Sequence, residues 1–467
     1  MRISIWSTFS LRGLSVSARR KLVYALFVVA GVAQGAIVPL LPRFSERFGL
    51  SGAQTALLLA LPGLATLAVS VPSGIVADRL GARRVTLTAA ALLCVSCVAQ
   101  AVPSLAALLV GRTVFGVAFG VVWTTGMAWL AELDAEAGRG SGLGAAVTYS
   151  SVGVMVGPAV AGALAQHAGL GAPFLAIALA SALLALPLVA CGRGPVAPAA
   201  AVRDRMRGGN ARAPGGDDEL DDRRCALGDE ELSLDGYERV QADDAGAAGR
   251  TVRELLVLMR RPGVGAAAGA LIISGAVSSA SQLLVSAGLH HAGLSTSRIG
   301  LAFSAAAVCY IAVSAVIVRL RGRAQTLHFN AMTTVILALA LAPAVTGDGV
   351  FVLVAALLLT SAPRAAISTI AYSLAAGQRA GEVVADGFVF GLLNGAWAGA
   401  TVLMPVIAGA VQQHAGARAA YMAVIIPSCG IAAWLMAHTR GGEHPGGGGY
   451  VARVRSRLAF RTAGTAG

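Results

Sequence analysis

Long runs of apolar residues, separated by short polar segments, cover most of this 467-residue chain. A helix of about 20 apolar residues crosses a hydrocarbon core of about 30 Å, because each residue adds about 1.5 Å. Each run is long enough for one such helix, so the pattern predicts an all-α polytopic membrane protein with twelve transmembrane helices. The predicted spans are residues 22–42, 54–76, 85–102, 105–128, 142–166, 172–191, 264–288, 297–318, 328–346, 350–373, 387–412 and 418–438.

Part of the fifth predicted span returns in the eleventh, 247 positions later. The matching pairs are Pro158 and Pro405, Ala161 and Ala408, Gly162 and Gly409, Ala163 and Ala410, Gln166 and Gln413, His167 and His414, Ala168 and Ala415, and Gly169 and Gly416. Identity without a gap predicts that the chain is two copies of one unit. Such duplication is a known construction of secondary transporters, which hold the solute where the halves meet.

The repeat divides the chain into two pseudo-symmetric six-helix bundles, residues 22–191 and 255–438. The polar segment between them, residues 192–254, has a composition that predicts a disordered cytoplasmic linker. We expect residues 1–21 to form a cytoplasmic N-terminal segment and residues 439–467 to form a disordered cytoplasmic tail.

The composition also indicates a membrane protein. The chain is 56% hydrophobic and 13% charged, with a mean hydropathy of +0.73, whereas soluble domains carry about 25% charged residues. A formal charge of +13 would suggest a nucleic-acid partner for a soluble protein, but arginines of membrane proteins gather in cytoplasmic loops. The arginines favour the loops that lie inside if both termini are cytoplasmic. The Ala-, Gly- and Arg-rich composition suggests a bacterial inner membrane.

A short segment with glycine, aspartate and arginine links the second and third predicted spans. Its distinctive residues are Gly74, Asp78, Arg79, Gly81, Arg83 and Arg84. A glycine near a helix end lets a neighbouring helix approach, and Gly81 permits a tight turn. The Asp78 carboxylate would meet positive helix ends and arginines on the cytoplasmic side. The alternative is a basic turn with no special role.

Two further motifs lie in the fourth and fifth predicted spans. Arg112 is expected within the membrane, where a charge costs several kcal/mol unless it faces protein or water. Two roles remain open for it: contact with a solute, or hydrogen bonds that hold the fourth span to the first. The fifth-span motif comprises Gly144, Gly153, Gly157, Pro158 and Gly162. Its proline bends the helix and its glycines form a flat packing face.

These three segments resemble signature motifs of the major facilitator superfamily, in the same order, and the resemblance covers residues 22–438. The first differs from the family pattern at Ala82, which leaves open which arginine makes the family's charge relay. The fifth-span motif is similar to that of the family's drug:proton antiporters, with Ala161 in place of a glycine. The resemblance implies alternating access of two bundles around a central solute site, with the Asp78 loop as a cytoplasmic latch.

The resemblance also places the first, fourth, seventh and tenth spans around the central cavity. The candidate cavity residues are Gln34, Arg112, Trp123, Gln282, Arg364 and Asn394. Carboxylates lie near the ends of the predicted spans, whereas Arg112 and Arg364 lie deep within them, which disfavours a cationic solute. We expect export of an anionic or neutral amphiphile or drug, with protons as the candidate exchanged ion. Alternatively, Arg364 bonds backbone carbonyls freed by Pro363.

We expect no enzymatic activity, no cofactor, no metal and no nucleic-acid partner. The six cysteines are scattered, and the closest two, Cys94 and Cys97, have no histidine or carboxylate beside them. The expected partners are a small-molecule solute and the lipid bilayer, and we expect a monomer. Two alternatives remain open: an importer of the same fold, acting as a symporter or uniporter, and a non-transporting membrane sensor.

Overall fold

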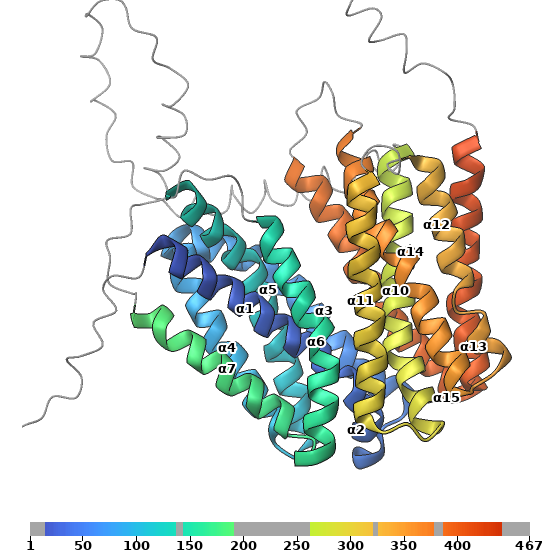
Figure 1. Cartoon of the computed structure of the whole chain (residues 1–467), viewed down its shortest axis with the longest axis horizontal. Helices are drawn as coiled ribbons and strands as arrows, with labels where there is room; N and C mark the ends of the chain where they lie inside the picture. Colours follow the sequence, from blue (N-terminus) through green and yellow to red (C-terminus); the bar gives the residue numbers. More distant parts are fainter. Residues whose placement is uncertain (1–14, 137–142, 191–261, 321–325, 378–385, 441–467) are drawn as a thin grey trace, which may run out of the picture.

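The computed structural model describes residues 15–136, 143–190, 262–320, 326–377 and 386–440, and every regular element within them is a helix (Figure 1). This confirms the predicted all-α class. The predicted linker, residues 192–254, lies outside the described part of the chain, as do most of the N-terminal segment and nearly all of the tail.

The described helices follow the predicted spans closely. The first half of the chain forms α1 (Val16–Ala36), the 3-10 helix η2 (Val38–Leu40), α2 (Leu41–Phe48), α3 (Gly52–Leu80), α4 (Ala82–Ala101), α5 (Leu105–Glu136), α6 (Leu143–Ala168) and α7 (Ala172–Ala190). The second half forms α10 (Pro262–His291), α11 (Thr296–Leu320), α12 (Leu327–Leu339), α13 (Pro343–Thr346), α14 (Val350–Gly377) and α15 (Asp386–Arg440).

The helices account for the twelve predicted spans. Ten helical segments within the described residues are long and apolar enough to cross a membrane. One of them lies in α15, where Gly416 has φ 83° and ψ 174°, so the chain turns there and α15 contains two spans. The apolar helix α7, 19 residues long, supplies the remaining span.

Prolines interrupt two spans that the sequence predicted as continuous. The first span breaks after Ala36, where Pro39 lies in η2 and Pro42 lies in the first turn of α2. The ninth breaks before Pro343, which begins α13. Proline has no N–H for the helical ladder and is tolerated best in the first turn of a helix. Each interruption therefore starts a new short helix.

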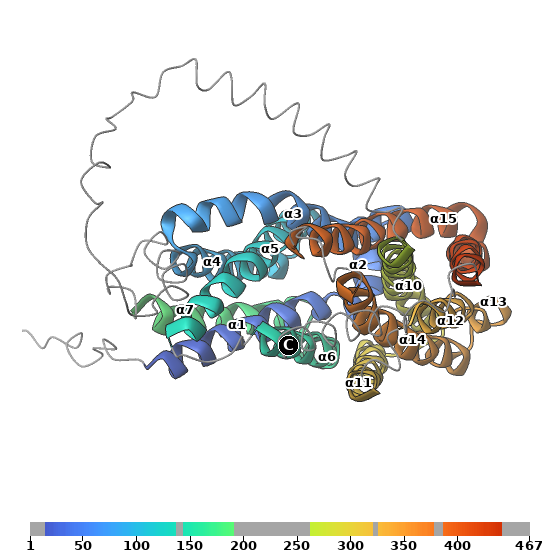
Figure 2. The same cartoon turned by 90° about the horizontal axis from the view of Figure 1, so that it is seen from above.

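The helices form two bundles that touch near one end. Helices α1–α7, blue to green, form one bundle, and α10–α15, yellow to red, form the other (Figure 1). Seen from above, α3 lies beside α15 on one side and α6 lies beside α11 on the other (Figure 2). We call the end at which α2 lies the closed end, and the opposite end, toward which the bundles separate, the divergent end.

The internal turns repeat with the halves. Gly169 and Gly416, 247 residues apart, have φ values of 90° and 83°. Gly49 and Gly293, 244 residues apart, have φ values of 61° and 85°. The pairing of helices repeats as well, since α1 packs on α6 as α10 packs on α15. The two bundles are thus pseudo-symmetric, as predicted.

Replacing Gly416 with alanine should lower the thermal unfolding midpoint of the detergent-solubilised protein. The Gly416 backbone conformation is one that only glycine adopts readily, and forcing another residue into it costs about 1–3 kcal/mol. The matched control is Gly395→Ala, also on α15, where an added Cβ has no neighbour within 4 Å. Because alanine favours a helix, that control should unfold at the same or a higher temperature. Equal midpoints for the two variants would contradict this assignment.

Candidate functional site

The first glycines of the fifth-span motif lie on the face of α6 that packs against α1. A Cβ on Gly157 would lie 2.6 Å from the carbonyl oxygen of Val32, and one on Gly153 would meet the α1 backbone even more closely. On α1, Gly31 and Gly35 approach the α6 backbone in the same way. Direct backbone contact therefore joins α6 to its own bundle.

The later residues of the same motif contact the other bundle. A Cβ on Gly162 would lie 2.5 Å from the carbonyl oxygen of Thr296, the first residue of α11. A Cβ on Gly300 of α11 would meet the carbonyl oxygen of Pro158. The motif therefore divides at Pro158 between contacts within a bundle and contacts between bundles.

Two hydrogen bonds accompany these contacts between α6 and α11. The backbone N–H of Ala159 donates to Oγ of Ser304 at 3.1 Å. The backbone N–H of Ser297 donates to Oε1 of Gln166 at 3.3 Å. Neither bond joins two charged groups, so each contributes about 1 kcal/mol.

The repeat produces a second contact of the same kind between α3 and α15. Gly409 on α15 is the repeat equivalent of Gly162 on α6. A Cβ on Gly52, the first residue of α3, would lie 2.5 Å from the carbonyl oxygen of Gly409, and the reverse approach is equally close. Each bundle thus places one motif glycine against the first residue of a helix in the other bundle. We call the α6–α11 and α3–α15 contacts together the seam.

The Asp78 loop lies at the divergent end of the first bundle. Helix α3 ends at Leu80 and α4 begins at Ala82, so Gly81, with φ 88°, makes the turn alone. The side chain of Asp78 lies outside the described part of the structure. The turn therefore gives Gly81 the conformational role that the sequence predicted, while the role of the carboxylate stays a prediction.

The other residues of the Asp78 loop differ in how far they are exposed to solvent. Arg83 is half-buried, whereas Arg79 and Arg84 are exposed. A Cβ on Gly74 would lie 3.6 Å from a methyl group of Thr124, which is an ordinary contact. The close helix approach expected at Gly74 is therefore absent from this conformation.

Arg112 lies inside the first bundle and is 1% exposed. Its Nε donates to the carbonyl oxygen of Leu58 on α3 at 2.8 Å. In a regular helix this oxygen would accept from residue 62, but Pro62 has no N–H. The guanidinium thus satisfies an acceptor that the proline leaves open. The bond joins the fourth span to the second, not to the first as one of the sequence interpretations had it.

The rest of the Arg112 guanidinium is less well satisfied. Its Nη1 is buried and has no hydrogen-bond partner among the described residues. Its Cζ lies 5.2 Å from the ring centroid of Phe115, within the range of a cation–π interaction.

Arg364 lies in the second bundle beside two other polar side chains. Its Nη2 donates to Oγ of Ser278 on α10 at 2.6 Å. The same oxygen accepts from Nε2 of Gln282 at 3.5 Å. Arg364 is half-buried, and its Cζ lies 5.8 Å from the ring centroid of Tyr310 on α11.

The structure thus brings together two candidate residues, Arg364 and Gln282. Nε of Arg364 is buried with no hydrogen-bond partner in the described part of the chain. The alternative in which Arg364 bonds carbonyls freed by Pro363 does not match the observed bond, because the partner is the hydroxyl of Ser278.

The remaining candidates are less informative. Gln34 on α1 is half-buried. Trp123 packs edge-on against Phe27 with ring centroids 5.2 Å apart, and its Nε1 is buried without a partner among the described residues. The side-chain surroundings of Asn394 and the packing of Gly144 lie outside what the structure describes.

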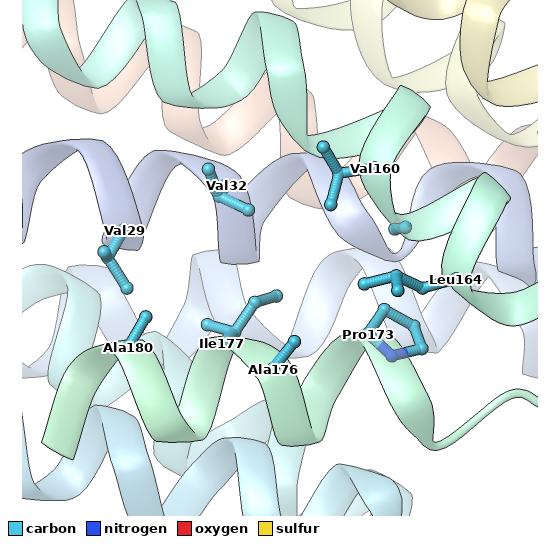
Figure 3. Close-up of a pocket in the computed structure, with 9 residues that line it drawn as sticks. Val29, Val32, Val160, Leu164, Pro173, Ala176, Ile177 and Ala180 are labelled. Atoms are coloured by element: carbon cyan, nitrogen blue, oxygen red, sulfur yellow. The ribbon is translucent and has the colours of Figure 1, made fainter. Parts of the chain in front are cut away.

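An apolar groove of about 200 Å³ lies between α1, α6 and α7 (Figure 3). It is lined by Val29, Val32, Val160, Ala161, Leu164, Pro173, Ala176, Ile177 and Ala180. A solute site needs a few polar groups to orient its ligand, and this lining offers none. Nor do the described residues contain a group of three or more His, Cys, Asp or Glu side chains that could hold a metal ion.

Comparison with known families agrees with this arrangement. The family model of the Major Facilitator Superfamily matches residues 23–385. The chain belongs to the major facilitator superfamily. This confirms the resemblance seen in the sequence and places the protein in a family of multi-pass membrane transporters, which is not a family of enzymes.

Individual relatives are distant or cover part of the chain. The MFS-type transporter ppzB of Metarhizium rileyi is 31% identical over 163 residues, which are 34% of this chain and 33% of that protein. The alignment thus spans about a third of that relative's length.

Solved structures show the same fold over more of the chain. A POT family transporter in complex with 5-aminolevulinic acid has a TM-score of 0.65 at 12% identity, covering 91% of this chain and 96% of that one. A bacterial homologue of the human lysosomal transporter Spinster, in an inward-facing and unoccupied conformation, has a TM-score of 0.61 at 14% identity, covering 91% and 95%.

The bond between Arg112 and the Leu58 carbonyl predicts energetic coupling between Arg112 and Pro62. Arg112→Met should destabilise the transporter by about 1–3 kcal/mol, because the Leu58 oxygen loses its donor. Adding Pro62→Ala supplies a backbone N–H for that oxygen, so the double variant should recover most of the loss. A double-mutant cycle of unfolding free energies in detergent measures this coupling. Strictly additive effects of the two substitutions would contradict the assignment.

Proposed function

We propose that this transporter exports a small anionic or neutral amphiphile or drug by alternating access, in exchange for protons. The observation that carries the proposal is the seam. Repeat-equivalent glycines join the bundles near one end, while the bundles separate toward the other (Figure 1). A pair of rigid bundles joined in this way can rock about a central site and expose it to alternate sides.

We assign the closed end to the outer face of a bacterial inner membrane. The exposed Arg79 and Arg84 lie at the divergent end, and basic residues of membrane proteins favour the cytoplasm. The conformation is then inward-facing, with both termini cytoplasmic. In the opposite state we expect the Asp78 loop to act as a latch on the cytoplasmic side.

The direction of transport is proposed from the fifth-span motif, which resembles that of drug:proton antiporters. Its Gly153 and Gly157 hold α6 to its own bundle, and Gly162 holds α6 to the other bundle. A helix with these two attachments can seal the outer side while solute is accepted from the cytoplasm.

The solute's charge is proposed from Arg364. This side chain is half-buried beside Ser278 and Gln282, and its Nε lacks a protein partner among the described residues. An anionic or hydrogen-bond-accepting group could complete this set of donors. Arg112 is proposed to have a structural role, because it is almost fully buried and bonds the α3 backbone.

Transport in proteoliposomes with imposed pH or potential gradients, over a panel of anionic, neutral and cationic compounds, tests the proposal. We expect flux of anionic or neutral compounds that depends on the pH gradient. Export of cationic dyes alone would contradict the proposed solute class. Binding without flux would favour a sensor, and flux driven only inward would favour an importer.

In the same assay, Arg364→Gln should weaken transport of anionic compounds about 10-fold or more, because a hydrogen bond to a charged group contributes about 1.5–3 kcal/mol. Neutral compounds should be affected much less. The matched control is Arg298→Gln at an exposed position of α11, which should leave both classes unchanged. Equal losses for anionic and neutral compounds would contradict the role of Arg364 in recognising charge.

A further inference from the structure

An acidic and a basic side chain meet across the two bundles at the closed end. Glu46 on α2 and His290 at the end of α10 lie 2.8 Å apart, between Oε1 and Nε2. These two residues are 244 positions apart. The same interval separates Gly49 from Gly293, which both have positive φ and precede the second membrane span of their bundle, α3 and α11.

Glu46 and His290 are therefore repeat-equivalent residues. A residue that contacts its own equivalent lies near the pseudo-twofold axis that relates the two bundles. Two identical copies would place the same side chain on both sides of this axis. Here the halves have diverged to a carboxylate and an imidazole, which attract each other when the imidazole is protonated.

The pair lines a cavity of about 260 Å³ at the closed end. The cavity is bounded by α2, α3, α10 and α15, so it includes both bundles and the α3–α15 half of the seam. The side chain of His290 is 23% exposed and that of Glu46 is 63% exposed. Solvent protons therefore reach the pair from this side of the membrane.

Among the residues that line the cavity, Glu46 is the carboxylate that faces His290. Helix α3 contributes Gly52 and Thr55, and α15 contributes Gln412 and Gln413, none of which carries a charge. On α10 itself, the ring of His291 lies 6.4 Å from the ring of His290, centroid to centroid. His291 is thus the other ionisable group in the lining, farther from His290 than the Glu46 carboxylate.

We propose that Glu46 and His290 form a proton-sensitive clamp that holds the closed end of the transporter shut. The charge of an imidazole changes between about pH 5 and 8, so acid on this side converts a hydrogen bond between a neutral imidazole and a carboxylate into an ion pair. Rocking of the bundles must break the pair, because its partners lie in different bundles. A proton that binds at the closed end therefore shifts the population toward the closed conformation.

The size of the effect follows from the exposure of the pair. Ion pairs that remain largely in solvent contribute little, which corresponds here to about a two- to fivefold change in the ratio of closed to open molecules. The inference rests on the alternating-access part of the proposed function. If the closed end faces outward, external acid favours return to the state that accepts solute from the cytoplasm.

Distances between two spin labels placed across the closed end, measured by electron paramagnetic resonance, test the clamp without any solute. Spin labels are placed at Ala168→Cys, at the end of α6, and Ala292→Cys, after α10, which are both exposed. The full-length chain, with its native cysteines replaced, is studied in nanodiscs between pH 5.5 and 8. We expect the closed population to rise about two- to fivefold relative to the open one as pH falls.

Substitutions at the pair separate the clamp from other sources of pH dependence. Glu46→Gln and His290→Gln should each abolish the pH response, whereas His414→Gln, an exposed histidine elsewhere at the closed end, should retain it. The exchange of both residues, Glu46→His with His290→Glu, should restore the response, because the two positions are equivalent.

The clamp alone would be overturned if the ratio of closed to open molecules did not change with pH in the parent chain. A pH response that persists in Glu46→Gln would also overturn it. A single population in every variant would overturn both the clamp and the alternating-access mechanism.

Discussion

Backbone-to-backbone packing at the seam is the contact on which the two-bundle arrangement depends. At Gly52, Gly162, Gly300 and Gly409 an added Cβ would lie closer to a backbone atom of the other bundle than real Cβ contacts allow. Between helices in a bilayer, association depends on close packing and on hydrogen bonds, because lipid tails are as apolar as the side chains. Removing the Cβ at these points therefore lets the bundles meet.

The seam must also come apart if the transporter alternates. Its polar contacts within the described residues are individually modest, Ala159 to Ser304 and Ser297 to Gln166, and the Glu46–His290 contact beside the seam is largely solvent-exposed. By contrast, α6 and α1 are in continuous backbone contact within one bundle. Pro158 lies between the two sets of contacts, so one helix combines a fixed attachment with a separable one.

The fold was largely predictable from the sequence. The repeated residues showed the duplication. Hydropathy reflects the free energy of transferring a segment into lipid, and the spans were predictable from it. It does not report where a chain bends, so the breaks at Pro39 and Pro343 were missed. Prolines in the predicted spans could have suggested these breaks, but Pro62 and Pro158 lie in helices that stay continuous.

The candidate site was less predictable. Arg112 and Arg364 were identified because buried charges are costly, but their partners, the Leu58 carbonyl and Ser278, depend on helix rotation and spacing. Glu46 and His290 were missed because they lie at helix ends, where charged residues are ordinary. The repeated Gly-Leu-Ser that follows them in each half, beginning at Gly49 and Gly293, was the available signal.

Hydrogen–deuterium exchange of Gly409→Leu tests most directly whether the seam opens as one unit. This substitution obstructs only the α3–α15 contact. If rigid bundles rock together, amide exchange should rise over residues 159–166 of α6 and 296–304 of α11, as well as in α3 and α15. The control Gly399→Leu, on the same helix with no neighbour within 4 Å of its added Cβ, should leave both regions protected. Faster exchange confined to α3 and α15 would contradict the account.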